Sequence, residues 1–420
     1  MKFQVPRGTA DVLAEEAELW DYIEQTSKGI FKRYNYKEIR TPIFEHTELF
    51  QRGVGETTDI VEKEMYTFTD RGGRSLTLRP EGTASVVRAF VEHKLYANPD
   101  PTKLFYIGPM FRYERPQSGR MRQFTQVGVE VLGSSDPAVD AEVISMAIRL
   151  FEEMGLRNLR LEINSVGCPV CRPIHREKLV THLHGVKEHL CKDCQSRLER
   201  NPMRILDCKN ETCQELTKDA PTIDQYLCDN CRTHHQKVKS YLDQMGIQYV
   251  ENPRLVRGLD YYTQTAFEII SEDIGAVGTL CGGGRYNGLV AEIGGNDVPG
   301  IGFAFSIERI ALALKQKGID GKLDTGVDVY FVTIGEKADS VSMKILDDLR
   351  KQGIKAEKDY LGRKIKAQMK AADRLQAKYV MILGDDEFDR EQVVLRDMSN
   401  GEQRDVPIYE IIPILTSKLK

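Results

Sequence analysis

The chain has 420 residues, of which 41% are hydrophobic, and its 59 Lys and Arg residues against 63 Asp and Glu residues give a net charge of −4. This length predicts two or three domains with substantial cores. The net charge excludes a strongly basic protein, so a nucleic-acid partner would have to bind a local basic surface.

The sequence also indicates the compartment in which the protein works. Its apolar runs all fall short of the ~18 residues that a membrane span needs, and the N-terminal stretch MKFQVPRGT lacks the apolar segment of a secretory signal. Nine cysteines without an export signal indicate reduced thiols or a metal site. We therefore expect a cytoplasmic protein with no membrane partner.

The first predicted elements are a long helix and a short strand. A turn-rich arm precedes residues 14–34, whose apolar residues recur near the 3.6-residue period of a helix. Residues 38–45 have the composition of a strand, and Pro42 within them implies a sheet edge or a break. From the pattern alone, this helix could equally pack on its own domain or form a subunit interface.

A strand is predicted at 76–79, and the turn after it leads into a helix over 84–94. Thr83 is placed to cap that helix. Alternatively, Glu81 and Thr83 face a ligand at the end of the strand. Capping alone explains Thr83 but leaves Glu81 merely solvated.

The segment 104–133 predicts two long strands joined by a loop. The first strand, at 104–114, is rich in aromatic and β-branched residues, and the second, at 123–132, alternates with period two. The connection at 115–122 contains Pro116 and Gly119, and it is too long to be a tight two-residue hairpin turn.

The same period predicts which side chains of this hairpin share a face. Arg112 and Glu114 fall on one face of the first strand, and Phe124, Gln126 and Glu130 fall on one face of the second. If both faces line one pocket, it contains an arginine, further polar groups and an aromatic ring. An ordinary hairpin with one solvated face is the alternative.

A cysteine-rich region follows a predicted helix at 136–154 and a strand at 159–164. Adjacent thiolates on a tight turn can share a tetrahedral metal ion, and three C-x-x-C pairs are typical of a zinc ribbon. Helical stretches at 176–190 and 233–245 could instead pack without metal. The cysteines concerned are Cys168, Cys171, Cys191, Cys194, Cys208, Cys213, Cys228 and Cys231.

Two glycine-rich and arginine-rich segments complete the first part of the chain. The glycines at 282–284 indicate close backbone approach, but they match neither a dinucleotide-binding motif nor a P-loop. Residues 299–310 predict a strand that runs into a helix with Ser306 as its N-cap. Arg309 then lies in the first helical turn, where a cation is unfavourable unless an anion binds there. An exposed arginine on a solvated face is the alternative.

The C-terminal part of the chain predicts a separate compact domain. Residues 315–326 are polar and contain glycines, which is typical of a linker. Strands and helices alternate beyond them, which indicates an α/β domain with a mostly parallel sheet. Lys364, Lys366 and Lys370 could face RNA, although a solvated helix face explains them equally well.

These segments together resemble the histidyl-tRNA synthetases, a family of class II aminoacyl-tRNA synthetases. Phe111-Arg112-Tyr113-Glu114, with Arg120 and Phe124, resembles motif 2 of that class, and the blocks LVRGLDYYTQTAFE and GGGRYNGL resemble two blocks peculiar to histidyl enzymes. The long helix with its strand resembles motif 1, and the segment around Arg309 resembles motif 3. Two residues depart from the family pattern: Asn287 stands where Asp is usual, and Gln264 where a basic residue is usual.

The resemblance implies an α+β fold: a class II antiparallel sheet with flanking helices over 1–325, an inserted mainly helical domain at about 168–250, and a C-terminal α/β anticodon-binding domain over 326–420. It implies the ATP-dependent attachment of L-histidine to tRNA(His) through a histidyl-adenylate, with release of AMP and pyrophosphate. ATP is expected as its Mg²⁺ complex, and the protein is expected to be a homodimer.

The resemblance also implies the roles of individual residues. Arg112 and Arg257 are expected to be catalytic, because phosphoryl chemistry needs positive charge around the developing oxyanions. The histidine site is expected to contain Glu81, Thr83, Arg112, Gln126, Glu130, Arg257, Tyr261, Tyr262 and Tyr286. The ATP site is expected to contain Arg112, Glu114, Arg120, Phe124 and Arg309. Arg115 and Gln117 are expected to contact the tRNA acceptor end, because both side chains can form paired hydrogen bonds.

No metal ligand is assigned by the resemblance. A structural zinc in the cysteine-rich insert stays open but is not favoured, because a metal is not part of the family's chemistry. Two other functions also stay open. One is a catalytically silent synthetase paralogue that senses histidine as the regulatory subunit of a phosphoribosyltransferase. The other is a zinc-dependent RNA-binding protein organised by the cysteines.

Overall fold

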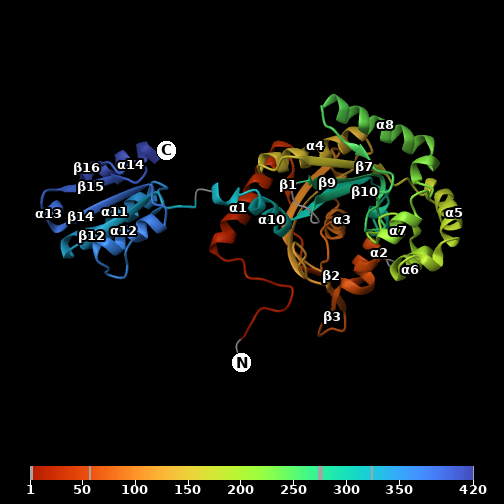
Figure 1. Cartoon of the computed structure of the whole chain (residues 1–420), viewed down its shortest axis with the longest axis horizontal. Coiled ribbons are helices and arrows are strands. Elements are labelled where there is room, and N and C mark those ends of the chain that lie inside the picture. Colours follow the sequence, from red (N-terminus) through yellow and green to blue (C-terminus); the bar gives the residue numbers. More distant parts are fainter. Residues whose placement is uncertain (1–2, 56–57, 273–277, 323–324, 420) are drawn as a thin grey trace. The chain divides into compact units, whose positions relative to one another are not determined.

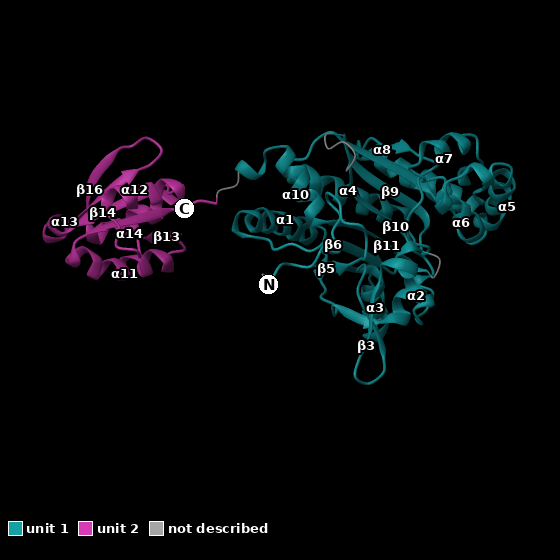
Figure 2. Cartoon of the chain, turned by 60° about the horizontal axis from the view of Figure 1, so that its bottom comes forward, with its two compact units in different colours: residues 1–322 teal, residues 323–420 magenta. Residues whose placement is uncertain are grey.

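A computed structural model describes residues 3–55, 58–272, 278–322 and 325–419 of the chain (Figure 1). The chain forms two compact units, residues 1–322 and 323–420, which are coloured separately in Figure 2. Among the described residues, no helix is both long enough and apolar enough to cross a membrane.

The first unit is built on an eight-stranded sheet with the order β1-β5-β6-β11-β10-β9-β7-β8. Its six central strands pair antiparallel, and the short outer strands β1 and β8 pair parallel with β5 and β7. The predicted α+β fold with an antiparallel sheet is therefore confirmed. The strands are β1 (Lys37–Glu38), β5 (Thr102–Phe111), β6 (Gln123–Leu132), β7 (Leu159–Ser165), β8 (Val250–Glu251), β9 (Thr263–Ser271), β10 (Thr279–Arg285) and β11 (Gly300–Ser306).

Helix α1 (Ala14–Arg33) packs against both α4 (Pro137–Glu153) and α10 (Ile307–Gln316), and α4 and α10 pack against this sheet (Figure 1). The alternation of β6 decides which side chains they cover: Val127, Val129 and Val131 are fully buried and lie on one face of the strand. The opposite face of β6 carries Gln126 and Glu130, which line a cavity. The sheet thus separates a hydrophobic core from a polar site, as its period-two pattern predicted.

A smaller antiparallel sheet, β2-β4-β3, stands next to α2 (Thr47–Val54) and α3 (Thr83–Glu92). The predicted strand at 38–45 is in fact divided between the two sheets, because the chain leaves the main sheet after β1 and joins the small sheet only at β2. The expected break near Pro42 is confirmed. The strands are β2 (Phe44–His46), β3 (Tyr66–Thr69) and β4 (Ser75–Leu78).

The cysteine-rich segment forms helices between β7 and β8 (Figure 1). Its helices are α5 (Cys171–His184), α6 (Lys192–Arg200), α7 (Glu211–Leu216) and α8 (Asp229–Gln244). Helices α5 to α7 enclose a small apolar core that includes Leu179, Leu183 and Leu198, and α8 packs on α4. Beyond β9 and β10, the short helix α9 (Leu289–Glu292) contacts α3.

Two expectations about the central hairpin need correction. β5 ends at Phe111, because the Tyr113 N–H turns away to donate to the Glu64 carbonyl. Arg112 and Glu114 therefore lie on the loop rather than on a strand face. The connection is long, as predicted, but its tip is a two-residue turn at Ser118 and Gly119, closed by paired backbone hydrogen bonds between Gln117 and Arg120. Gly119 has a φ of +70°, which glycine adopts without strain.

The start of α3 also differs from the prediction. Gly82 is the N-cap and Thr83 is already the first helical residue, so Thr83 does not cap the helix. The Glu81 carboxylate takes that role and accepts the N–H groups of Thr83 (2.7 Å) and Ala84 (2.8 Å). Glu81 is 2% exposed and not merely solvated, because these bonds satisfy a carboxylate that the pocket buries.

The second unit has a five-stranded sheet with the order β13-β12-β14-β15-β16. The first three strands pair parallel, but β14, β15 and β16 pair antiparallel, so the sheet is mixed rather than mostly parallel. The alternation of strands and helices expected from the sequence fails at β15 and β16, which follow one another without an intervening helix. The elements are β12 (Val329–Ile334), α11 (Glu336–Lys351), β13 (Ala356–Lys358), α12 (Ile365–Arg374), β14 (Tyr379–Gly384), α13 (Asp385–Asp389), β15 (Gln392–Asp397), β16 (Gln403–Pro407) and α14 (Ile411–Leu419).

Candidate functional site

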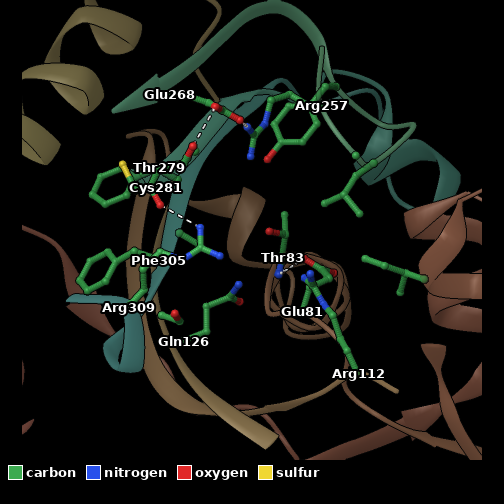
Figure 3. A pocket seen from close by; sticks show the side chains of 18 of the residues that line it. Glu81, Thr83, Arg112, Gln126, Arg257, Glu268, Thr279, Cys281, Phe305 and Arg309 are labelled. Atoms are coloured by element: carbon green, nitrogen blue, oxygen red, sulfur yellow. Dashed lines mark hydrogen bonds and ion pairs between the residues drawn. The ribbon is translucent and has the colours of Figure 1, made fainter. Parts of the chain in front are cut away.

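A cavity of about 460 Å³ opens on the polar face of the main sheet. Strands β6, β9, β10 and β11, the start of α3, the loop after β5 and the segment before β9 all contribute to its walls (Figure 3). The structure places every residue that was expected to bind histidine or ATP in this one lining. They are Glu81, Thr83, Arg112, Glu114, Arg120, Phe124, Gln126, Glu130, Arg257, Tyr261, Tyr262, Tyr286 and Arg309.

Glu130 is the most deeply buried acid of the cavity, with 1% of its surface exposed. Its carboxylate accepts hydrogen bonds from the Thr83 hydroxyl (2.8 Å) and the Tyr286 hydroxyl (2.6 Å). Burial raises the pKa of Glu130 to about 8, although these two hydrogen bonds oppose the shift. Among the described residues, no arginine forms an ion pair with Glu130, so a structural ion pair does not account for this buried acid.

Glu81 is a second buried carboxylate in the same lining. Burial raises its pKa, while the hydrogen bonds from the start of α3 and the charge of Arg112 act against the rise. Two buried carboxyl groups that form no ion pair with any described residue favour a ligand with positive charge or with several N–H donors. Gln126 stands beside them, and its Oε1 accepts the Gly82 N–H (3.1 Å) and the Tyr106 hydroxyl (3.3 Å).

Three tyrosine rings form an aromatic wall of the cavity. The rings of Tyr261 and Tyr262 lie 4.8 Å apart, and the rings of Tyr261 and Tyr286 lie 5.8 Å apart in an edge-to-face arrangement. All three rings are buried, which fixes their orientation. The wall suits a flat aromatic or heteroaromatic group.

Arg257 reaches the cavity from the segment that precedes β9. It forms an ion pair with Glu268 of β9 and lies 5.6 Å from the centre of the Tyr262 ring. Burial acts to lower the pKa of Arg257, but the Glu268 carboxylate together with the Tyr262 hydroxyl and other neighbours outweighs burial and raises the pKa above its ordinary value. The guanidinium lies directly against Gly282 of β10, where any Cβ atom would overlap it. This close approach is the reason for a glycine at that position.

Two other arginines enter the cavity from different segments, and Figure 3 shows the guanidinium groups of Arg112, Arg257 and Arg309 reaching in from three sides. Arg112 donates from Nε to the Pro80 carbonyl (2.8 Å) and lies 5.4 Å from the centre of the Phe124 ring. Arg309 donates to the Thr279 carbonyl (2.8 Å). Burial and the nearby Arg120 charge lower the pKa of Arg309. Converging cations of this kind bind polyphosphates.

Arg115 and Gln117 lie outside this lining, on the exposed tip of the loop after β5. The loop is held at its base, where the Arg122 N–H donates to the Gly8 carbonyl (2.7 Å) and the Arg122 guanidinium lies 3.8 Å from the centre of the Tyr113 ring. The tip is therefore available to a ligand outside the cavity.

The sequence interpretation missed two acids that organise the site. Glu268 is the ion-pair partner of Arg257, and the presence of a charged residue within an apolar strand was the available signal. Glu308 accepts the Thr125 N–H (2.7 Å) and so ties α10 to β6; burial raises its pKa to about 7. Its role depends on a contact between residues 183 positions apart, which no local pattern reveals.

The two departures from the family pattern lie next to each other. The Asn287 Nδ2 donates to the Gln264 Oε1 (2.9 Å), and the Gly300 N–H donates to the Asn287 Oδ1 (3.3 Å). A pair of amides thus stands where the family pattern leads us to expect an acid and a basic residue. Because the two residues satisfy each other, the departures leave the cavity lining intact.

The antiparallel sheet and the arginine-lined cavity on its polar face are those of a class II aminoacyl-tRNA synthetase. The "Histidyl-tRNA synthetase" family profile matches residues 8–310, and the "Anticodon binding domain" profile matches residues 328–418. The chain belongs to the histidyl-tRNA synthetase family.

Full-length relatives are similar throughout. The chain is 59% identical to the histidine–tRNA ligase of Geobacillus sp. (strain WCH70) over 100% of both chains, and 58% identical to that of Desulforamulus reducens over 98% of this chain and 99% of the relative. The crystal structure of apo S. aureus histidyl-tRNA synthetase matches with a TM-score of 0.83 and 46% identity, over 99% of this chain and 100% of that one. The histidyl-tRNA synthetase structure from Nostoc sp. matches with a TM-score of 0.74 at 20% identity over 100% of both chains, which shows a shared fold.

Proposed function

We propose that this chain catalyses the ATP-dependent attachment of L-histidine to tRNA(His) through a histidyl-adenylate, with release of AMP and pyrophosphate. The observation that carries the proposal is one cavity that combines arginines from three segments with two buried carboxylates. We assign catalysis to residues 1–325, with an inserted domain at about 168–250, and anticodon binding to residues 326–420.

Histidine is recognised at the acidic and aromatic part of the cavity. Glu81, Thr83 and Gln126 hold the ammonium group, and Glu130 accepts one imidazole N–H. Each Glu130 oxygen already accepts one hydroxyl. Donation by an imidazole N–H favours the ionised form of the carboxyl group, which offers about four lone-pair sites, so capacity remains. Tyr262 contacts the other ring nitrogen, and Tyr261 and Tyr286 close the wall.

The first chemical step is the attack of the histidine carboxylate on the α-phosphorus of ATP, which enters with Mg²⁺ as its substrate complex. Arg112 and Arg257 stabilise the charge that develops on the α-phosphate oxygens, because their guanidinium groups are held in place before the reaction. Arg309 binds the remaining phosphates or the adenine, and Phe124 offers the adenine a stacking surface. Glu114 and Arg120 complete the nucleotide site, and a guanidinium nitrogen of Arg120 lies 3.5 Å from a carboxylate oxygen of Glu114.

The second step transfers histidine to the 3′ end of tRNA. Arg115 and Gln117 contact the acceptor end, since the loop tip that carries them is exposed beside the cavity opening. The exposed Lys364, Lys366 and Lys370 in and before α12 offer the second unit a basic surface for RNA.

We further assign the protein to the cytoplasm as a homodimer. An apolar surface next to the motif 1 segment supports the dimer. The rings of Phe44 and Phe68 pack 6.3 Å apart, yet the two residues stay 51% and 43% exposed, and Ile43 beside them is 45% exposed. A contiguous apolar surface of this kind is typical of an interaction site.

The regulatory alternative draws support from one neighbour, described as an ATP phosphoribosyltransferase regulatory subunit/histidyl-tRNA synthetase from Bacillus halodurans, which shares the fold at 22% identity and a TM-score of 0.64. The regulatory alternative would require a protein that binds histidine but does not convert it to the histidyl-adenylate. The complete arginine set and the match of the anticodon-binding profile favour the enzyme.

Pyrophosphate exchange with each of the twenty amino acids tests the proposal. We expect exchange with histidine alone. Histidine binding without exchange would favour the regulatory alternative, and exchange with a different amino acid would refute the assignment of the pocket.

A further inference from the structure

We propose that the cysteine-rich segment binds two structural zinc ions, each held by four cysteine thiolates. The first site consists of Cys168, Cys171, Cys228 and Cys231, and the second consists of Cys191, Cys194, Cys208 and Cys213. Within each group, all four sulfur atoms lie within 4.8 Å of one another.

The sulfur positions match tetrahedral coordination. A Zn–S bond of about 2.3 Å in a tetrahedron places the sulfur atoms roughly 3.8 Å apart. The Sγ atoms of Cys168 and Cys171 are 3.6 Å apart, those of Cys168 and Cys228 are 3.9 Å apart, and those of Cys191 and Cys208 are 3.9 Å apart. Disulfides join sulfurs in pairs at about 2.05 Å, whereas here the sulfurs cluster in fours.

The two sites share the same local backbone arrangement. In each, the first cysteine of a C-x-x-C pair is the N-cap of a helix and the second is its third residue: Cys191 and Cys194 on α6, Cys228 and Cys231 on α8. The positive end of the helix dipole stabilises thiolates at these positions. The repetition of this arrangement on two separate helices supports a common ligand.

Backbone N–H groups already point at the sulfurs in a matching way. The Cys191 N–H donates to the Cys213 Sγ at 3.2 Å, and the Cys228 N–H donates to the Cys171 Sγ at 3.2 Å. Donors to metal-bound thiolates of this kind orient the ligands and offset their negative charge. In both sites the donor is thus the N-cap cysteine, and the acceptor is a cysteine outside the donor's own C-x-x-C pair.

The fold accounts for two cysteines that fall outside the C-x-x-C pairs of the sequence. Spacing shows three C-x-x-C pairs and leaves Cys208 and Cys213 without a pairing pattern. In the fold, these two cysteines complete a second tetrahedron around Cys191 and Cys194. Both groups combine buried with partly exposed thiols, so an ion can enter each site and then be shielded.

The two sites have different positions in the fold. The first joins the entry of the insert to the start of α8, across 60 residues of chain. Next to it, Arg172 donates to the carbonyls of Val166 and Tyr262, so this site supports the segment that carries the aromatic wall of the cavity. The second site lies within the small core of α5 to α7, where Cys194 and Cys213 are fully buried. A core of this size commonly needs a metal or disulfides for stability.

Metal analysis of the full-length protein, purified without chelators or a metal-affinity tag, tests the proposal. We expect two zinc ions per chain. The double variant Cys228→Ser/Cys231→Ser and the double variant Cys191→Ser/Cys194→Ser should each retain one ion. Cys281→Ser is the matched control, since Cys281 is a buried cysteine on β10 outside both groups, and it should retain two.

A second measurement does not depend on folded variants. A mercurial added stepwise to the wild-type protein, with a chromogenic zinc chelator present, should release two zinc ions as eight thiols react. Cobalt substitution should give the visible absorption of tetrahedral thiolate coordination. Thiols that react without releasing zinc, disulfides between these cysteines, or iron with inorganic sulfide in place of zinc would each overturn the proposal.

Discussion

The elevated pKa of Glu130 predicts how the stability of the first unit depends on pH. In the folded protein this carboxyl group keeps its proton up to a pKa of about 8, whereas its ordinary value is 4.5. The folded state therefore holds a proton that the unfolded state loses between these two values. Stability due to this group is fully present below pH 4.5 and decreases as the pH rises towards 8. Glu130→Gln removes the titration.

The size of the effect follows from the pKa difference. Each pH unit between the two pKa values changes the free energy of unfolding by about 1.4 kcal/mol. From pH 5.5 to 7.5 the wild type should therefore lose on the order of 2–3 kcal/mol relative to Glu130→Gln. A constant offset between the two proteins is also expected, because glutamine cannot accept from both Thr83 and Tyr286 in the same way as a carboxyl group. The test is therefore how the difference in the free energy of unfolding between the two proteins changes with pH, and not its absolute size.

Urea unfolding followed by tryptophan fluorescence is a suitable assay, since the chain has one tryptophan, Trp20, and it lies in α1 of the first unit. The other buried acids, Glu81 and Glu308, are present in both proteins, so the difference reports the titration of Glu130 together with its repulsion by Glu81. Parallel stability curves for wild type and variant across this pH range would refute the reasoning. A difference infrared spectrum should independently show a protonated carboxyl group at neutral pH in the wild type only.

Substitutions at three further positions test the assigned roles. Arg257→Ala should reduce pyrophosphate exchange by about 10²–10³-fold in a folded protein, and Arg257→Lys should also be poor because lysine lacks the planar fork; normal exchange by either folded variant would contradict the catalytic role. Gln117→Ala should impair aminoacylation and leave pyrophosphate exchange intact, so an equal loss in both assays would move Gln117 into the first step. Gly282→Ala should displace the Arg257 guanidinium and so reduce pyrophosphate exchange, although no ligand-contacting residue is itself substituted. The control is Gly29→Ala on α1, where a Cβ meets open space, and this variant should keep full exchange. Equal exchange by Gly282→Ala and Gly29→Ala would show that the enzyme tolerates displacement of the Arg257 guanidinium.

The amino-acid sequence by itself determined the elements whose side chains repeat with a clear period. β6 was predicted at 123–132 and is found at Gln123–Leu132, because alternation of apolar and polar residues specifies both a strand and its buried face. The helices predicted at 14–34 and 136–154 were likewise confirmed within one or two residues at α1 and α4. The residues of the cavity were expected from the resemblance to the histidyl-tRNA synthetases, and the fold brings them into one lining.

Tertiary structure alone decided which distant groups contact one another. The end of β5 depends on a hydrogen bond from Tyr113 to Glu64, and the position of Arg257 depends on Glu268 and on the absence of a side chain at Gly282. The four-sulfur groups join cysteines as far apart in the chain as Cys168 and Cys231. Local periodicity carries no information about such pairings, because they arise only when strand register and helix packing place separate segments side by side.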